Sequence, residues 1–240
     1  MIRFDNTYYQ KKFDQLAPHY RISDFLSFGM AEYYRKQAIQ KTSIIENSHI
    51  IDLMCGTGNN APIILNEPKN NIRYTGIDFS KQMILCAVSK YKNTPKISFL
   101  QCNLFESIPL PTKANHILCT YGLKCINPLM YKAFVKKINT MTDDNGTISI
   151  VEFQFSNSCF FRFLFKFYLN TLFRLGCLVT FRSMIPVNAL LNTISSRIDI
   201  VLLEELFLQE GFDVIIEKKC MGSVILIYGK KRPCKKLDKV

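Results

Sequence analysis

Hydrophobic and polar residues follow one another in a pattern that predicts parallel β-strands separated by helices. Short apolar runs end in turn residues and are followed by amphipathic stretches, an order typical of α/β proteins. The expected strands are residues 48–53, 72–78, 96–101, 114–120 and 147–153. Helices are expected at 59–66, 81–91 and 128–141, and a turn at 143–146.

Further elements are expected on both sides of this core. The helices predicted at 8–16 and 30–41 precede the first strand, so they form either a lid over a ligand site or packing against the sheet edge. Residues 186–194 and 201–210 are expected to be helical, the latter ended by Gly211. Residues 212–218 and 223–229 alternate as two strands, which predicts an antiparallel hairpin.

The 240 residues are therefore expected to form one α/β domain. Its fold is a Rossmann-like, seven-stranded, mostly parallel sheet with a C-terminal antiparallel hairpin, N-terminal lid helices and a helical insertion after the fifth strand. We divide the chain into lid helices (1–45), a ligand-binding core (46–153), the helical insertion (154–197), a closing helix and hairpin (198–230) and a basic tail (231–240).

The insertion contains a stretch, residues 159–181, that is dense in Phe and Leu. Arg162, Lys166, Asn170 and Arg174 are spaced four apart and would form one polar stripe on a helix. A basic, strongly amphipathic helix is typical of contact with a membrane surface. The alternatives are a lipophilic substrate pocket, packing onto the domain, or a homodimer interface.

Charge and composition narrow the classes of partner. The net charge of +12 and the pI near 9.3 favour nucleic acid, an acidic membrane surface or phosphorylated substrates, unless they reflect only a lysine-rich solvated surface. Nine cysteines include no C-x-x-C and no zinc-type Cys/His spacing, so we expect reduced thiols and no metal. The polar N-terminus and the lack of a long uncharged apolar run predict a cytoplasmic protein, with any membrane contact peripheral.

The segment most informative about chemistry is residues 50–60. An apolar strand ends at Asp52, and a turn containing Gly56 and Gly58 leads into a helix, which brings backbone N–H groups close to a ligand. The next strand ends at Asp78, and an acid at that position usually holds ribose hydroxyls. Ala61 stands where a dinucleotide-binding motif needs a third glycine, and no Lys-Ser/Thr follows, which excludes a P-loop.

This arrangement, D-x-x-x-G-x-G, resembles the first motif of class I S-adenosylmethionine (SAM) methyltransferases; an ordinary strand–turn–helix corner is the alternative. Other segments resemble the quinone C-methyltransferases of ubiquinone/menaquinone biosynthesis. Residues 13–20, F-D-Q-L-A-P-H-Y, are similar to that family's F-D-x-x-A-x-x-Y-D. Residues 26–29 (L-S-F-G), 121–124 (Y-G-L-K), 151–153 (V-E-F) and the closing segments 206–212 and 228–230 follow its other motifs, so the resemblance covers about residues 8–230.

The resemblance implies SAM as cofactor, S-adenosylhomocysteine as its product, and a SAM site lined by Thr57, Asp78, Asn103, Leu104 and Thr120. The glycine turn would meet the methionine part, and the Asn103 amide suits the adenine edge. The full expected cofactor-binding set is Asp52, Cys55, Gly56, Thr57, Gly58, Asp78, Phe79, Asn103, Leu104 and Thr120.

The departures from the family pattern fall on its substrate side. Arg21 stands for Asp, Tyr34 for Trp, and Lys124-Cys125 for Arg-Asn. We therefore expect that SAM binding is kept and that the acceptor is either a quinone precursor or another small aromatic or polyketide-like molecule.

Deprotonating a phenol would make its ortho carbon nucleophilic, so a base near the acceptor is needed. The expected catalytic residues are His19, Tyr20 and Lys124, with Glu152 as a further candidate. His116 lies mid-strand and is expected to be structural.

The function predicted is SAM-dependent methyl transfer to a small aromatic or lipophilic acceptor, either quinone-precursor-like C-methylation or a related natural-product methylation. The alternatives are O- or N-methylation of a small molecule, or a SAM-binding cyclase or scaffold that transfers no methyl group. A nucleic-acid substrate is not expected, because no N-P-P-Y-type motif follows the fourth strand and no RNA-binding appendage is recognisable.

Overall fold

The computed structural model describes residues 6–20, 27–68, 71–110, 112–156, 158–181 and 198–233. Its strands are β1 (His49–Leu53), β2 (Arg73–Asp78), β3 (Ile97–Gln101), β4 (Ala114–Thr120), β5 (Thr142–Phe153), β6 (Phe212–Lys219) and β7 (Val224–Lys231). Its α-helices are α1 (Asn6–Leu16), α3 (Met30–Gln40), α4 (Ala61–Leu65), α5 (Lys81–Lys90), α6 (Tyr131–Met141), α7 (Cys159–Tyr168), α8 (Arg174–Phe181) and α10 (Ile200–Gln209). Shorter turns are the 3-10 helices η1 (Ala17–His19), η2 (Leu123–Cys125), η3 (Pro128–Met130) and η5 (Cys220–Gly222), and the π-helical η4 (Leu169–Phe173).

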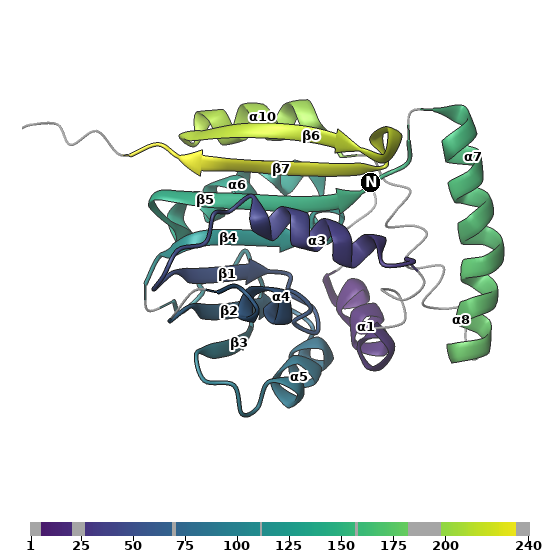
Figure 1. Ribbon diagram of the computed structural model, residues 1–240, viewed down its shortest axis with the longest axis horizontal. Helices are drawn as coiled ribbons and strands as arrows, with labels where there is room; N and C mark the ends of the chain where they lie inside the picture. The colour runs from purple at the N-terminus through teal and green to yellow at the C-terminus, as the bar shows by residue number, and fades with distance from the viewer. Residues whose placement is uncertain are drawn as a thin grey trace, which may run out of the picture.

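The strands form one seven-stranded sheet in the order β3-β2-β1-β4-β5-β7-β6. Strands β1 to β5 run parallel, whereas β7 is antiparallel to both β5 and β6. The carboxyl ends of the parallel strands therefore all lie on the same side of the sheet, on the right in Figure 1. We call this row of strand ends the carboxyl edge. This topology confirms the predicted mostly parallel sheet with a C-terminal hairpin.

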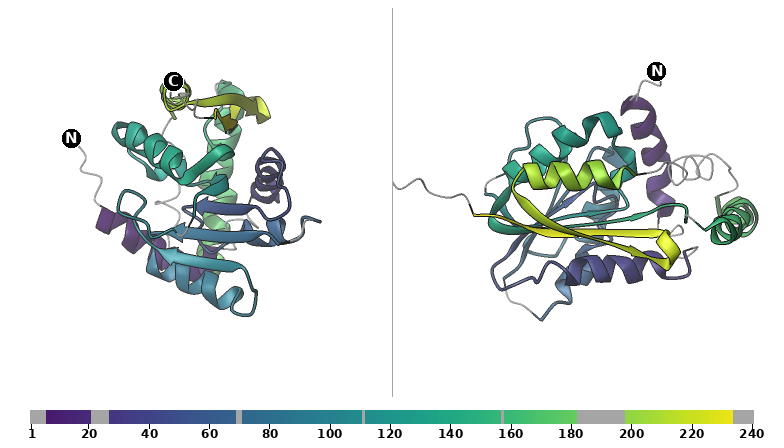
Figure 2. Two further views of the ribbon diagram at one scale, coloured as in Figure 1. Left: turned by 90° about the vertical axis from the view of Figure 1, so that its left-hand side faces the viewer. Right: turned by 90° about the horizontal axis from the view of Figure 1, so that it is seen from above.

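Helices cover both faces of the sheet (Figures 1 and 2). Helices α3 and α4 pack on one face, where Ile39 and Ile64 join Ile50 of β1 in one buried cluster. Helices α6 and α10 cover the other face through Phe134 and Phe207. Every residue of β1 is consequently buried, which explains why this strand has a nearly continuous apolar run instead of strict alternation.

The N-terminal segment lies at the carboxyl edge of the sheet, beside the start of α5. The Oδ1 atom of Asp14 accepts hydrogen bonds from Ser80 Oγ at 2.6 Å and from the Gln82 amide at 3.1 Å. The Phe13 ring meets the Phe79 ring edge-on at 6.0 Å. Helix α1 thus has the position that a lid requires, whereas α3 packs on the sheet face.

Two elements differ in detail from the expectation. Residues 143–146, expected as a turn, belong to β5, but the pairing with β4 jumps from Ala114–Thr142 to His116–Thr147, and Asn145 has a positive φ. These four residues therefore loop out of the ladder inside the strand. The helix expected at 128–141 begins as the 3-10 turn η3 before α6. The helix expected at 186–194 lies outside the described residues.

Replacing Phe207 by Ala should lower the free energy of unfolding by about 3 to 5 kcal/mol, because the ring is fully buried and packs edge-on against Phe212 at 5.7 Å. Urea denaturation measures the change. Val201→Ala on the same helix is the matched control, since Val201 is 66% exposed, and it should change stability by less than about 0.5 kcal/mol. Equal losses in the two variants would contradict this description of the core.

Candidate active site

The turn between β1 and α4 is tied to the end of β2. Met54, Gly56 and Gly58 all have positive φ, of 54°, 54° and 74°. The Gly56 amide donates to Asp78 Oδ2 at 2.8 Å, and the Cys55 amide donates to the carbonyl of Ile77 at 3.0 Å. The glycine turn and the strand-end acid therefore form one unit.

Asp78 is buried at the carboxyl end of β2. Its Oδ1 accepts from the Ser80 amide at 2.9 Å, and Ser80 in turn caps α5 by accepting from the Met83 amide. Burial raises the pKa of Asp78 to about 6, against the opposing effect of the hydrogen bonds from Ser80 and Gly56. A carboxylate has about four lone-pair sites, so Asp78 keeps acceptor capacity for a ligand hydroxyl beside its backbone hydrogen bonds.

Asp52 lies deeper, at the end of β1, and is completely buried. Tyr74 Oη donates to its Oδ2 at 2.5 Å, and Asn60 Nδ2 lies 3.0 Å from both carboxylate oxygens. Burial raises the pKa of Asp52 to about 7, while the bonds from Tyr74 and Asn60 and the charge of Arg35 act in the opposite direction. This carboxylate fixes the turn to its neighbours and does not face an open surface.

Asn60 links Asp52 to β4 through its side-chain amide. Its Nδ2 is 3.0 Å from Thr120 Oγ1, and Thr120 Oγ1 is 3.3 Å from Asn60 Oδ1. Thr120 ends β4, so one amide side chain joins the ends of the two central strands. Asn60 is not among the residues expected from the sequence, although its position two residues after the second motif glycine is a possible signal.

Thr57 and Cys55 complete the turn. Lys90 Nζ donates to both the carbonyl and the Oγ1 of Thr57, each at 3.0 Å, and so joins the end of α5 to the turn. Burial raises the pKa of the Cys55 thiol well above its usual range, which leaves it protonated and inert. Lys90 was not among the expected site residues, because nothing in its local sequence distinguishes it from a surface lysine.

The remaining expected cofactor residues lie at the same edge of the sheet. Asn103 follows β3, and its Oδ1 accepts from the Phe105 amide at 3.1 Å; Leu104 beside it is buried. The Phe79 carbonyl accepts from Gln10 Nε2 at 3.2 Å, which connects it to α1. Because β3, β2, β1 and β4 are neighbours in the sheet, the fold brings the whole predicted set together.

Of the expected catalytic residues, Tyr20 approaches the glycine turn from the N-terminal segment. A β-carbon placed on Gly56 would lie 3.8 Å from Cε1 of Tyr20. His19 belongs to the η1 turn, but its side chain lies outside the described residues. His116 is buried between Ser48 and Thr147, in the part of β4 away from the carboxyl edge, as expected of a structural residue.

Lys124 and Glu152 form a buried pair after β4 and at the end of β5, with exposed fractions of 7% and 5%. Glu152 Oε2 accepts from the Lys124 amide at 3.3 Å, and its Oε1 accepts from the Phe153 amide at 2.9 Å. Burial raises the pKa of Glu152 to about 7, partly offset by the charge of Lys124. Burial lowers the pKa of Lys124 to about 8, again opposed by its partner.

Aromatic and cationic groups gather on the opposite face of the sheet, where Phe153 packs on the α3 side while Glu152, the preceding residue of β5, points to the other face. The Tyr121 ring stacks on Phe153 with a centroid distance of 4.7 Å, and Arg35 Cζ lies 5.0 Å from the centre of the Tyr121 ring. Gly122 is required here because a β-carbon would fall 2.7 Å from Cβ of Met54, in the loop after β1. The two loops therefore touch, and the loop that leads to Lys124 is positioned by the turn after β1.

No group of three Asp, Glu, His or Cys side chains suited to a metal ion occurs among the residues that the structure describes. The arrangement at the carboxyl edge thus consists of backbone donors, one strand-end carboxylate, amide and hydroxyl groups, and a buried lysine–glutamate pair.

Comparisons with known proteins identify relatives of this arrangement. Residues 1–231 match the model of the ubiE/COQ5 methyltransferase family. A ubiquinone/menaquinone biosynthesis C-methyltransferase from Geotalea daltonii is 28% identical over 166 residues, which are 66% of this chain and 68% of the relative. A demethylmenaquinone methyltransferase from Lactobacillus johnsonii is 25% identical over 229 residues, 92% of this chain and 91% of the relative.

Among solved structures, the fold is similar to a chain in the complex between the Haloferax volcanii Trm112 methyltransferase activator and a putative methyltransferase. The TM-score is 0.63 at 16% identity, over 92% of this chain and 97% of that one, so this likeness concerns the fold alone. The family match spans nearly the whole sequence. The chain therefore belongs to the ubiE/COQ5 methyltransferase family and is a SAM-dependent methyltransferase.

Proposed function

We propose that this protein transfers the methyl group of SAM to a ring carbon of a lipophilic phenol of the quinone-precursor class. The observation that carries the proposal is the common edge of the sheet, where the glycine turn, Asp78 and Thr120 lie beside the buried pair of Lys124 and Glu152. The names of the two relatives, which act in quinone biosynthesis, support the class of acceptor.

The residues at this edge fit SAM in shape and polarity. Glycine at positions 56 and 58 allows the positive φ values of the turn. A β-carbon on Gly56 would meet its nearest neighbours only at 3.8 Å, so the methionine part would pass at Gly56, whereas the ring of Phe99 packs against Gly58. Asp78 would accept the ribose hydroxyls, Asn103 would meet the adenine edge, and Thr120 would lie beside the sulfonium. When bound, SAM supplies a methyl group that its sulfonium makes electrophilic.

The acceptor side suits an aromatic ring with an acidic hydroxyl group. A carboxylate whose pKa lies near 7 is matched to removing a proton at neutral pH, and burial gives Glu152 that pKa. The Lys124 ammonium beside it would stabilise the phenolate that forms. Once the ring carbon has taken the methyl group and S-adenosylhomocysteine has left, the hydrogen on that carbon departs as a proton and the hydroxyl group is restored. The stacked rings of Tyr121 and Phe153 add an aromatic surface at the same carboxyl edge, on the other face of the sheet from Glu152.

Wild-type protein should bind SAM and S-adenosylhomocysteine with micromolar affinity in calorimetric titrations, and Asp78→Ala should weaken both at least about tenfold. The reason is the loss of a carboxylate that accepts hydroxyl hydrogen bonds, each worth about 1.5 to 3 kcal/mol when charged. Asp78→Asn keeps the side-chain size and should show a smaller loss in the same direction. Asp143→Ala, an exposed acid in β5, is the control and should bind normally. Folded wild-type protein without SAM affinity would refute the proposed site.

The pH dependence of kcat/KM should be bell-shaped, with limbs near pH 7 and pH 8. Activity needs Glu152 deprotonated, so it falls as pH drops below the pKa of about 7, and it needs Lys124 protonated, so it falls above about 8. Because the two groups interact, the two apparent pKa values describe the Glu152–Lys124 pair and not each residue separately.

Glu152→Gln should lower kcat about 100-fold and remove the acid limb, because the base is lost. Lys124→Arg should keep activity and remove the alkaline limb, because a guanidinium stays protonated throughout this range. Both variants should bind SAM like the wild type. If both limbs of the pH profile persist unchanged in the two variants, groups other than Glu152 and Lys124 remove the proton and stabilise the phenolate.

A further inference from the structure

The helical insertion stands apart from the sheet. Helix α7, η4 and α8 follow one another from Cys159 to Phe181 and begin shortly after β5 ends at Phe153. Figure 1 and the right panel of Figure 2 show this helical segment on the carboxyl-edge side of the sheet, set apart from the main body. It therefore lies on the side of the molecule that carries the candidate active site.

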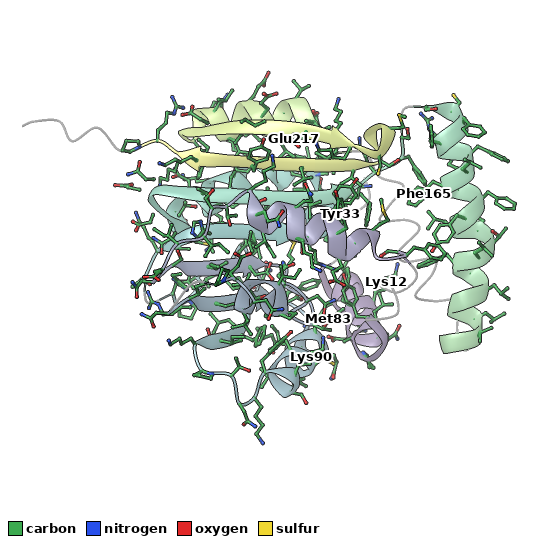
Figure 3. The ribbon with its side chains drawn as sticks, in the orientation of Figure 1. Lys12, Tyr33, Met83, Lys90, Phe165 and Glu217 are labelled. Atoms are coloured by element: carbon green, nitrogen blue, oxygen red, sulfur yellow. The ribbon has the colours of Figure 1, made fainter. Side chains whose placement is uncertain are left out.

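The inner side of the segment is held by aromatic contacts. Phe165 meets the Phe155 ring edge-on at 5.7 Å, and Figure 3 shows Phe165 between α7 and the sheet. Tyr168 lies 5.7 Å from Phe28 in the loop before α3. Arg162 Nε also donates to the Ser156 carbonyl at 3.0 Å. These contacts determine which side of the helix faces the body.

The opposite side presents large apolar side chains to solvent. Phe160 and Phe163 are 65% exposed and Phe167 is 57% exposed, and the rings of Phe163 and Phe167 stack at 6.4 Å. Further along, three aliphatic side chains are exposed to a similar degree. We call this set the outer ridge: Phe160, Phe163, Phe167, Leu172, Leu175 and Val179. A contiguous apolar surface of this kind marks an interaction site.

The charge around the outer ridge is entirely positive. No Asp or Glu occurs between Glu152 and Asp199, whereas Arg162, Lys166 and Arg174 lie within the helical segment. The whole chain carries a net charge of +12. These cations follow the flank between the ridge and the body: Arg162 donates to the Ser156 carbonyl, and Lys166 Nζ lies 5.5 Å from the centre of the Phe155 ring. An apolar aromatic ridge on a segment whose charged side chains are all basic matches the interface of a bilayer with anionic head groups.

We propose that the outer ridge docks onto an anionic lipid bilayer, with the helical segment lying in the plane of the interface and its aromatic rings below the head groups. No helix of the described chain is long and apolar enough to cross a bilayer, so the contact is made from one side. A second copy of the chain fits less well, because pairing the same ridge across a two-fold axis would bring like cations together.

Docking in this way would turn the acceptor side of the sheet towards the lipid. An acceptor that partitions into a bilayer could then enter the site without crossing water; this consequence, unlike the docking itself, rests on the proposed function. Lipid binding and SAM binding are therefore measured separately, so that one can fail without the other.

Cosedimentation with vesicles tests the docking. The protein should bind vesicles of phosphatidylcholine and phosphatidylglycerol much better than vesicles of phosphatidylcholine alone, and added salt should weaken binding. The triple variant Phe160→Ser, Phe163→Ser, Phe167→Ser should bind at least about 100-fold more weakly, because three rings no longer enter the apolar layer. Lys166→Gln should lose about fivefold. The double variant Val201→Ser, Ile215→Ser, at exposed apolar positions outside the helical segment, is the matched control and should bind normally.

The absence of tryptophan allows a second, independent readout. Phe163→Trp introduces one fluorophore into the outer ridge, and Val201→Trp places one on α10. Emission of the first should shift to the blue on adding anionic vesicles and be quenched by brominated acyl chains. Emission of the Val201→Trp variant should neither shift to the blue nor be quenched.

Three results would overturn the proposal. The first is wild-type protein that binds SAM but does not cosediment with anionic vesicles. The second is undiminished vesicle binding by the triple variant. The third is a wild-type dimer in sedimentation velocity that the triple variant converts to monomer without any lipid binding, which would make a second copy the occupant of the ridge.

Discussion

A buried carboxylate at the end of β1 holds the candidate site together. Asp52 has no contact with solvent, and burying a charged group without partners would be very unfavourable. Hydrogen bonds from Tyr74 and Asn60 offset that cost, and they also fix the positions of β2 and the start of α4. Through Asn60 the same network reaches Thr120 at the end of β4. The spacing of the groups proposed to hold SAM thus follows from one buried acid.

The cofactor side and the acceptor side depend on the same backbone. The turn after β1 bends through three residues with positive φ, and Met54 within it packs against Gly122 in the loop after β4. That loop leads directly to Lys124, whose amide donates to Glu152. A change in the turn would therefore move both sides of the site together, which is the rigidity that aligning a methyl donor with an acceptor requires.

The sequence predicted the sheet and the identity of the strand-end residues because both follow from local pattern. Apolar runs determined the strands, and parallel strands place their carboxyl ends at one edge. The contacts made by Asn60 and Lys90 could not be predicted, since each joins elements that are distant in sequence. The orientation of the helical insertion was open for the same reason. Its polar stripe turns partly inward: Arg162 binds the Ser156 carbonyl, and in the described structure Nε of Arg174 is buried without a hydrogen-bond partner.

The most direct test of this account is the fate of a labelled methyl group. The protein would be incubated with SAM carrying a carbon-13 methyl and with a prenylated demethyl-hydroquinone, and the product analysed by mass spectrometry and carbon NMR. Our account predicts one added methyl group, bound to a ring carbon, and no transfer by Glu152→Gln above about 1% of the wild-type rate. A label on oxygen, or consumption of the acceptor without gain of a methyl group, would contradict it.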